Sequence, residues 1–315
     1  MTQTRRLPAP VALGGAVAIG AMTAIQARIN GVLGVRIDEG IVAGLISFGV
    51  GLVLLLIATA ALPGARRGAA RLVRGVRTRR VPIWMLLGGA CGALTVSTQG
   101  LTAGLLGVSL FTVGVVAGQT VHGLLLDRLG VGPAGVVAVT PGRILGGVFA
   151  LAAVAISLSG DAVSTTPFIL LALPFLAGVG IAWQAAANGR LAQRVQSPMA
   201  ATLMSFIAGT LVLLVASAVS VAVGGMPRAL PMEPWLYLGG VLGFVYILLG
   251  ATIVAHTGVL LLGLGSVLGQ LVTSVIIDLL WPAASGPALW QLAAMIAMAA
   301  ASVLVALPWR RRRRR

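Results

Sequence analysis

Two pairs of side-chain amides occur at helical spacing in a chain that is otherwise strongly apolar. Gln26 and Asn30 are four residues apart, and so are Gln184 and Asn188. Residues four apart lie on one face of an α-helix, so each pair would present two hydrogen-bonding groups in the same direction. Amides buried in lipid need polar partners, which can be a bound solute, water or a neighbouring helix. The pairs therefore predict either the lining of a polar pathway or hydrogen bonds that hold helices together.

The amide pairs belong to a longer pattern that the chain carries twice. The first block recurs 158 residues later: Gln26, Asn30, Gly31, Leu33, Arg36, Ser47, Phe48 and Gly51 match Gln184, Asn188, Gly189, Leu191, Arg194, Ser205, Phe206 and Gly209. The second block recurs 151 residues later: Trp84, Gly88, Gly89, Gly92, Gly114, Gly118, Gln119 and Asp127 match Trp235, Gly239, Gly240, Gly243, Gly265, Gly269, Gln270 and Asp278. The difference of seven residues falls around the Arg-rich segment 63–81, which we interpret as a loop. A duplication of half the chain predicts two homologous halves around a shared polar centre, as in secondary transporters.

The composition is that of an integral membrane protein. Of the 315 residues, 58% are hydrophobic and only 9% are charged, whereas soluble domains carry about 25% charged residues. The 43 glycines would let helix backbones approach closely in lipid, where hydrophobicity does not drive helices together. The single cysteine, Cys91, lies in an apolar stretch and offers neither a disulfide nor a metal framework. The sequence carries no enzyme motif, so we expect no enzymatic activity, cofactor or metal.

Apolar stretches long enough to cross the hydrocarbon core, which takes about 20 residues, follow one another along the whole chain. We predict an all-α membrane protein with ten transmembrane helices. The predicted spans are 9–29, 41–62, 82–100, 104–126, 141–159, 167–187, 199–223, 235–255, 258–280 and 288–308. They form two five-helix repeats, residues 1–160 and residues 161–315, and the second repeat ends in an Arg-rich tail.

The placement of the arginines predicts the orientation in the membrane. All 22 basic residues are arginine, and they cluster between or beyond the apolar spans. With both termini in the cytoplasm, 19 arginines fall inside and three, Arg28, Arg36 and Arg228, fall outside, in agreement with the positive-inside rule. Five spans is an odd number, so the two repeats would insert in opposite orientations, as an inverted repeat. The expected location is the cytoplasmic membrane, with multiple spans.

The net charge of +16 does not indicate binding of nucleic acid. No aromatic residues interleave with the arginine clusters to stack on bases, and membrane topology explains where the clusters lie. The tail Arg310–Arg315 is expected to contact anionic membrane lipid.

Two further amides follow glycine ridges on the fourth and ninth predicted spans. Gln119 and Gln270 each come directly after a Gly-x-x-x-Gly motif. Close packing beside a buried amide predicts either a narrow central binding site or a helix crossing with one interhelical hydrogen bond. His122, three residues after Gln119, is either a pathway residue that titrates near neutral pH or a histidine satisfied within the fold.

Tryptophans and acids complete the candidate site. Trp84, Trp183 and Trp235 could supply apolar contact to a substrate or belong to the aromatic belt at the membrane interface. Asp127 and Asp278 are equivalent positions of the two halves and lie near the ends of predicted spans. They are either interfacial groups, held by ion pairs or hydration, or sites of proton coupling.

The duplicated residues resemble those of the drug/metabolite transporter (DMT) superfamily, and more closely its YdcZ-like branch, in which five-span units occur singly or fused in tandem. The resemblance is carried by Gln26, Asn30, Gly31, Leu33, Ser47, Phe48, Gly51, Gly118, Gln119 and Asp127, with their counterparts in the second half. It covers nearly the whole chain. It implies a ten-helix inner-membrane carrier of small metabolites or drugs that works by alternating access.

The sequence therefore predicts a secondary transporter with a small-molecule substrate, neutral or weakly charged because the spans offer few fixed charges. The candidate substrate-binding or pathway residues are Gln26, Asn30, Trp84, Gln119, His122, Trp183, Gln184, Asn188, Trp235 and Gln270, and the candidates for proton coupling are Asp127 and Asp278. The site is expected near the midplane, with walls from spans 9–29, 82–100, 104–126, 167–187, 235–255 and 258–280. The alternative is a non-transporting membrane protein: a sensor, a scaffold or a lipid-modifying enzyme.

Overall fold

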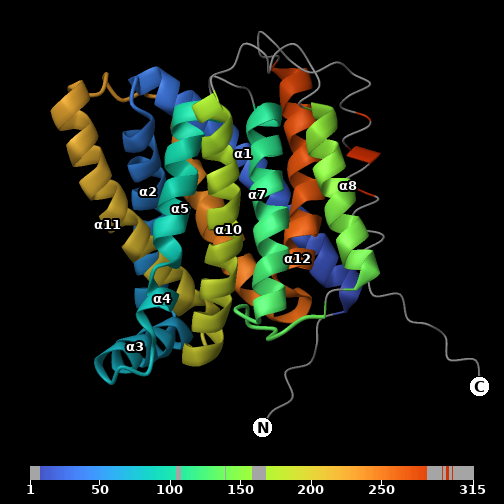
Figure 1. The fold of residues 1–315 in the computed structure, drawn as a ribbon. Helices are drawn as coiled ribbons and strands as arrows, with labels where there is room; N and C mark the ends of the chain where they lie inside the picture. Colours follow the sequence, from blue (N-terminus) through green and yellow to red (C-terminus); the bar gives the residue numbers. More distant parts are fainter. Residues whose placement is uncertain are drawn as a thin grey trace, which may run out of the picture.

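The computed structural model describes residues 8–103, 108–138, 140–157 and 168–281, with a few isolated positions beyond. All regular secondary structure within these residues is helical, so the predicted all-α class is confirmed. Figure 1 shows the helices side by side in one bundle. Within the described residues, four helical stretches are long and apolar enough to cross a membrane: Pro10–Ile37, Gly40–Ala61, Pro198–Gly224 and Pro234–Leu280.

Most helices begin or end within a few residues of a predicted span, but α1 and α10 each extend eight residues beyond the predicted end. The helices are α1 (Ala9–Ile37), α2 (Gly40–Ala61), α3 (Pro63–Arg77), α4 (Ile83–Leu86), α5 (Gly88–Thr98), the π-helical turn η1 (Gln99–Ala103), α7 (Val108–Leu129), α8 (Pro141–Ser157), α10 (Phe168–Val195), α11 (Pro198–Gly224), the 3-10 turn η2 (Pro234–Tyr237) and α12 (Gly239–Leu280). The predicted span 288–308 lies almost wholly outside the described residues, so the count of ten helices stays a prediction.

α12 consists of two arms joined at a break. Gly258 has φ 76° and ψ 172°, a backbone conformation that only glycine adopts readily. The break separates the predicted spans 235–255 and 258–280, and Figure 1 shows the chain reversing direction there at the lower end of the bundle. One long apolar segment thus supplies two of the helices that surround the centre.

The Arg-rich segment 63–81 differs from its prediction as a loop, because residues 63–77 form the helix α3. Ala65, Gly68 and Leu72 recur every three or four residues and are buried, while the arginines between them are exposed. The helix lies across the lower end of the bundle in Figure 1. Its exposed face is strongly basic, as expected for a helix that lies in a membrane interface.

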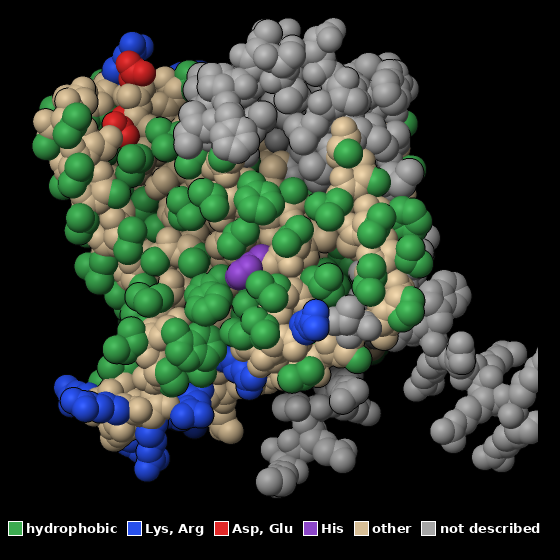
Figure 2. Space-filling model, in the orientation of Figure 1, with side chains coloured by type: hydrophobic (Ala, Val, Ile, Leu, Met, Phe, Trp, Pro, Cys, Tyr) green, Lys and Arg blue, Asp and Glu red, His purple; other side chains and the backbone are tan. Residues whose placement is uncertain are grey.

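The two ends of the bundle differ in charge. Arg71 of α3 bonds to the end of α10 through Val195 O (2.7 Å), so α3 and the end of α10 together make what we call the basic end. At the other end lie Asp38, Glu39 and Glu233, which we call the acidic end. Figure 2 shows arginines gathered along the lower edge and acidic side chains at the upper edge.

Glycines set the closest helix crossings. A Cβ atom on Gly20 of α1 would collide with the Ser266 carbonyl of α12, and one on Gly178 of α10 would collide with the Val115 carbonyl of α7. Gly178 is 158 residues after Gly20, and Ser266 is 151 residues after Val115. The two crossings therefore use equivalent residues. In one the glycine comes from the first repeat and the carbonyl from the second, and in the other these origins are reversed.

A second pair of crossings obeys the same rule. Gly89 of α5 packs on the Ser205 carbonyl of α11, and Gly240 of α12 packs on the Ser47 carbonyl of α2. Between these crossings Phe48 of α2 and Phe206 of α11 pack against each other, with ring centroids 4.8 Å apart. Each half thus packs mainly against the other.

Candidate functional site

The two central glutamines bond to each other. Gln270 Nε2 donates to Gln119 Oε1 at 3.2 Å and to Ser266 Oγ at 2.8 Å, and both glutamine side chains are buried. The residues are equivalent positions of the two halves, so the contact lies where the halves meet. The interhelical hydrogen bond, one of the two predicted roles, is present. It links α7 to the second arm of α12.

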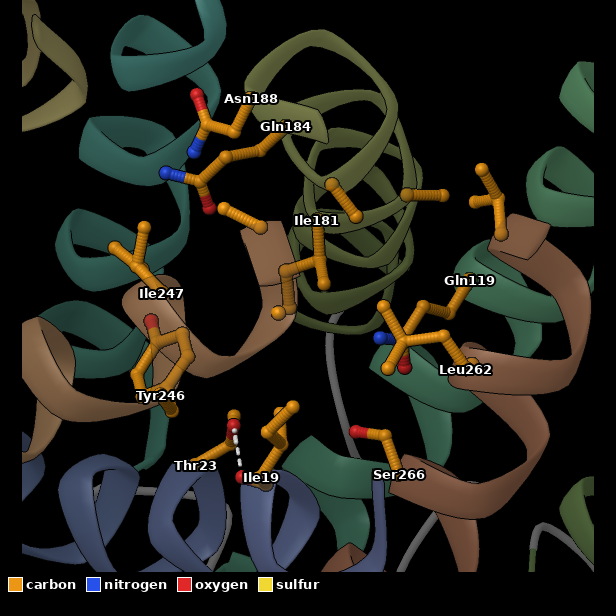
Figure 3. A pocket seen from close by; sticks show the side chains of 16 residues that line it. Ile19, Thr23, Gln119, Ile181, Gln184, Asn188, Tyr246, Ile247, Leu262 and Ser266 are labelled. Atoms are coloured by element: carbon orange, nitrogen blue, oxygen red, sulfur yellow. Dashed lines mark hydrogen bonds between the residues drawn. The ribbon is translucent and has the colours of Figure 1, made fainter. Parts of the chain in front are cut away.

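A small cavity of about 50 Å³ opens beside this pair. Its walls come from α1, α7, α10 and both arms of α12 (Figure 3). The lining residues are Ile19, Thr23, Gln119, Ile181, Ala182, Gln184, Ala185, Asn188, Tyr246, Ile247, Gly250, Ala251, Val259, Leu262, Gly263 and Ser266. None of them is charged, and the volume suits a few water molecules. Five of the six predicted wall spans contribute, and the exception is span 82–100.

Gln184 and Asn188 supply the amides on one side of the cavity. Gln184 Nε2 and Asn188 Nδ2 both donate to Ser205 Oγ of α11, at 3.1 and 3.3 Å. Figure 3 shows these side chains reaching the pocket from α10, with Gln119 on the opposite side and Tyr246 between α10 and α1. The cavity thus offers amide and hydroxyl groups that can donate to or accept from a polar solute.

Gln26 and Asn30, the equivalents of Gln184 and Asn188, do not line the cavity. Gln26 Nε2 donates to Gly239 O at 2.7 Å, and Asn30 Nδ2 donates to Gln99 Oε1 at 2.8 Å. All three amide side chains are at most 1% exposed. These groups are packed against protein, whereas Gln184 and Asn188 line the small cavity. We call the region of the bundle around Gln26, Asn30 and Gln99, toward the acidic end, the filled half, and the region around the cavity the cavity half.

Gln99 is a residue that the sequence analysis missed. It occupies the position equivalent to Gly250, which lines the cavity and has no atom within 4 Å of an added Cβ. Phe111 and Leu262 are a second such pair, and again the larger side chain lies in the half near the acidic end. The sequence feature that could have identified Gln99 is a difference between the repeats: an amide stands at position 99, and a glycine stands at the equivalent position 250. A π-helical turn at Gln99, a distortion common at functional sites, marks the same place.

Three buried amide atoms in this filled half have no hydrogen-bond partner within the described part of the chain. They are Gln26 Oε1, Asn30 Oδ1 and Gln99 Nε2. Buried polar atoms are nearly always paired, and each exception needs an explanation because it costs about 1–3 kcal/mol. The three atoms belong to neighbouring side chains, so they form one cluster of buried amide groups.

Short contacts close the bundle at both ends. At the basic end, Arg190 donates to Gly130 O at 2.6 Å and to Val131 O at 3.0 Å, which holds loop 130–138 under α10. At the acidic end, Arg36 pairs with Glu233 at 2.7 Å and Arg228 with Asp38 at 3.1 Å. The pairs at the acidic end are exposed, so their contribution to stability is small.

The tryptophans lie away from the central cavity. Trp84 and Trp183 make an edge-to-face contact with centroids 5.9 Å apart and line a groove of about 760 Å³ near the basic end. Trp235 lines a groove of about 710 Å³ with Arg28 and Arg36. Figure 2 shows a largely apolar surface between the two charged ends. These positions fit the interfacial belt better than substrate contact. His122, half-buried on α7, also lies outside the cavity lining.

Asp127 caps a helix. Its carboxylate accepts the backbone N–H groups of Val259 (2.7 Å) and Leu260 (3.1 Å), which begin the second arm of α12. An acidic side chain at a helix N-terminus satisfies otherwise unpaired donors and interacts favourably with the helix dipole. This is a structural role that the sequence analysis did not weigh. Asp278, its counterpart, is half-buried near the end of α12.

Comparison with known proteins agrees with this architecture. A family model described as "Putative inner membrane exporter, YdcZ" matches residues 11–156 and 169–304. The chain belongs to this family. The YdcZ resemblance expected from the duplicated motifs is thereby confirmed, and the chain is a membrane protein of a transporter family. The two matched segments begin 158 residues apart, the same offset as the amide motif.

Solved structures support the fold. Six chains of solved structures match, and one of them, titled "Crystal structure of protein", aligns with a TM-score of 0.60 over 96% of this chain and 97% of that chain. At 18% sequence identity this likeness concerns the fold alone. No protein of curated function matches the chain.

Proposed function

We propose that this YdcZ family member is a secondary transporter that moves a small, polar, neutral or weakly charged solute across the cytoplasmic membrane by alternating access. The three unpaired amide atoms of Gln26, Asn30 and Gln99 carry the proposal. They are the groups that a solute would satisfy if the filled half opened. The uncharged lining of the existing cavity favours the same class of solute.

The proposed architecture is ten helices in two inverted five-helix repeats, residues 1–160 and 161–315. The glycine crossings support it, because each contact between a glycine of one repeat and a carbonyl of the other recurs between the equivalent residues with the two repeats reversed. An inverted repeat can take the same two shapes in either half. In this proposal the cavity half and the filled half exchange shapes during transport.

The proposed orientation places the basic end in the cytoplasm, together with both termini. The exposed arginines of α3 and Arg194 support it, since cytoplasmic loops gather positive charge. In this orientation the filled half faces outward and the cavity is displaced toward the cytoplasm. The Asn30–Gln99 bond then belongs to the outer seal, and Arg190 with loop 130–138 belongs to the inner seal.

The contacts of Asp127 favour helix capping over proton coupling. A proton on its carboxylate would weaken two backbone hydrogen bonds at the start of the second α12 arm. Transport coupled to protonation of Asp127 would therefore destabilise the second arm of α12 each time a proton bound. We propose that Asp127 stabilises the broken helix and that the solute gradient can drive the carrier.

The test is uptake and efflux in proteoliposomes against a metabolite panel, with and without a pH gradient. Candidate solutes are first selected by the rise they cause in the thermal unfolding midpoint of the purified protein. The variants Gln119→Leu and Gln184→Leu should abolish transport of a selected solute. Thr252→Val should not, because Thr252 is exposed and bonds only within its own helix.

Vesicles that stay inert across the panel would favour the alternative of a sensor, a scaffold or a lipid-modifying enzyme. Unchanged transport in both glutamine variants, with normal insertion, would remove the central cavity from the mechanism. A strict requirement for the pH gradient would restore proton coupling.

A further inference from the structure

A second concave site lies at the basic end, outside the transport cavity. It has a volume of about 310 Å³ and is lined by Arg71, Arg74, Gly75, Thr78, Arg80, Val81, Arg194 and Val195. Four guanidinium groups therefore border one small pocket between α3 and the end of α10. We call these residues the basic pocket.

Two of the four arginines are fixed by the fold. Arg71 donates to Val195 O (2.7 Å) and Gln196 O (2.9 Å), and Arg194 donates from Nε to Arg80 O (2.8 Å). The side chains of Arg74 and Arg80 make no hydrogen bond within the described part of the chain. The pocket thus has a rigid basic wall and two arginines with unused donors.

No described acid balances this charge. Asp38, Glu39 and Glu233 lie at the acidic end of the bundle, and the carboxylate of Asp127 is buried against α12. Asp278, near the end of α12, does not line the pocket. Four arginines held close together repel one another, and an anion relieves that repulsion. Arginine forms paired, charge-assisted hydrogen bonds with phosphate oxygens.

The basic pocket borders a larger groove, whose lining combines apolar side chains with Arg190, Gln193 and Arg194. Arg194 lines both the pocket and the groove of about 760 Å³ that contains Trp84, Trp183 and Leu129. A ligand that fills both needs an anionic group joined to an apolar body. Tryptophans beside arginines are also the pair of residue types that membrane proteins place at the headgroup level.

We propose that the basic pocket and its groove bind an anionic phospholipid, with the phosphate between Arg74, Arg80 and Arg194 and the acyl chains along Trp84 and Trp183. The site is separate from the transport cavity and does not depend on the proposed transport. It would hold α3 and the end of α10 at the surface of one leaflet.

The test measures lipid binding to the purified full-length protein after delipidation in detergent. The readout is the rise in thermal unfolding midpoint on titration with dioleoyl phosphatidylglycerol. Dioleoyl phosphatidylcholine and inorganic phosphate serve as separate arms. The wild-type protein should respond to phosphatidylglycerol at low concentration and respond to neither of the other two.

The double variant Arg74→Gln/Arg80→Gln should lose affinity for phosphatidylglycerol by about thirty-fold, given the usual contribution of each arginine to anionic lipid binding. Arg66→Gln/Arg77→Gln removes the same number of charges at positions outside the pocket, so it should keep the wild-type affinity. Native mass spectrometry of co-purified lipid gives a second readout that needs no unfolding transition. An equal loss in the control, or stabilisation by inorganic phosphate alone, would overturn the proposal.

Discussion

Replacing Gln99 with glycine should shift the protein toward a conformation that is open at the acidic end. The substitution makes this helix position identical to Gly250 in the other half. It removes the only hydrogen bond that the structure gives the Asn30 amide nitrogen, at 2.8 Å, and leaves that donor buried and unpaired. An unpaired buried donor costs about 1–3 kcal/mol. Part of this is offset because the variant also removes Gln99 Nε2, which has no partner now.

A net cost of about 1–2 kcal/mol to the observed conformation corresponds to a shift of about 5- to 30-fold in the conformational equilibrium. The loss of helix propensity at the new glycine applies to both conformations and cancels in this comparison. The shift should be large enough to follow by chemical labelling. It should have a definite direction, since only the filled half loses a contact.

The assay uses two reporter positions that are equivalent in the halves, Ala27 and Ala185. Ala27 is buried, whereas Ala185 lines the cavity. In a Cys91→Ala background, each is replaced by cysteine and labelled with a membrane-impermeant maleimide. Gln99→Gly should speed labelling at position 27 and slow it at position 185. Thr102→Val is the matched control, because the Thr102 hydroxyl bonds only to Thr98 O within its own segment.

Unchanged labelling at both positions in a folded Gln99→Gly variant would refute the reasoning. So would faster labelling at both, because this would indicate general loosening. An equal response to Thr102→Val would show that the region is merely sensitive to substitution.

Three further predictions follow from the same contacts. Gly250→Gln should place an amide in the cavity and abolish transport while insertion stays normal, since the Cβ of the new side chain meets no atom within 4 Å. Asp127→Ala should lower the free energy of unfolding by about 1–2 kcal/mol through loss of the helix cap, measured by denaturation in detergent. The Arg36 hydrogen bond lowers the pKa of the exposed Glu233 carboxyl below its ordinary value of 4.5. This link is therefore intact at neutral pH and is lost only as the pH falls through the lowered pKa. A spin label near Arg36 should gain mobility in that acid range, and Glu233→Gln should abolish the pH dependence.

Much of the helix arrangement could be predicted from the sequence because lipid imposes strong constraints on it. Apolar length predicts the helices, and the break at Gly258 falls between two predicted spans. The glycine ridges predict an interhelical hydrogen bond at Gln119 or Gln270, but the bond between these two residues is seen only in the structure. Segment 63–81 was taken for a loop because its arginines hide the buried stripe of Ala65, Gly68 and Leu72.

The site was harder to predict because identical motifs have different surroundings. Gln26 and Gln184 match within the repeat, yet only Gln184 lines the cavity. The difference depends on Gln99 and Gly250, which are not part of any shared motif. The role of Asp127 likewise depends on a backbone 132 residues away. Neither contact follows from spacing along one helix.

The unequal halves have a consequence for the energetics of transport. If both halves were identical, an inverted repeat would favour neither conformation, and the carrier would populate both equally. Here the filled half gains the Asn30–Gln99 bond but has three unpaired amide atoms. In the cavity half, the amides of Gln184 and Asn188 donate to Ser205 and line the cavity. The opposing terms are each about 1–3 kcal/mol, so the two conformations can remain close in free energy without symmetry. A solute that pairs with the amides of Gln26 and Asn30 would then be enough to shift the balance.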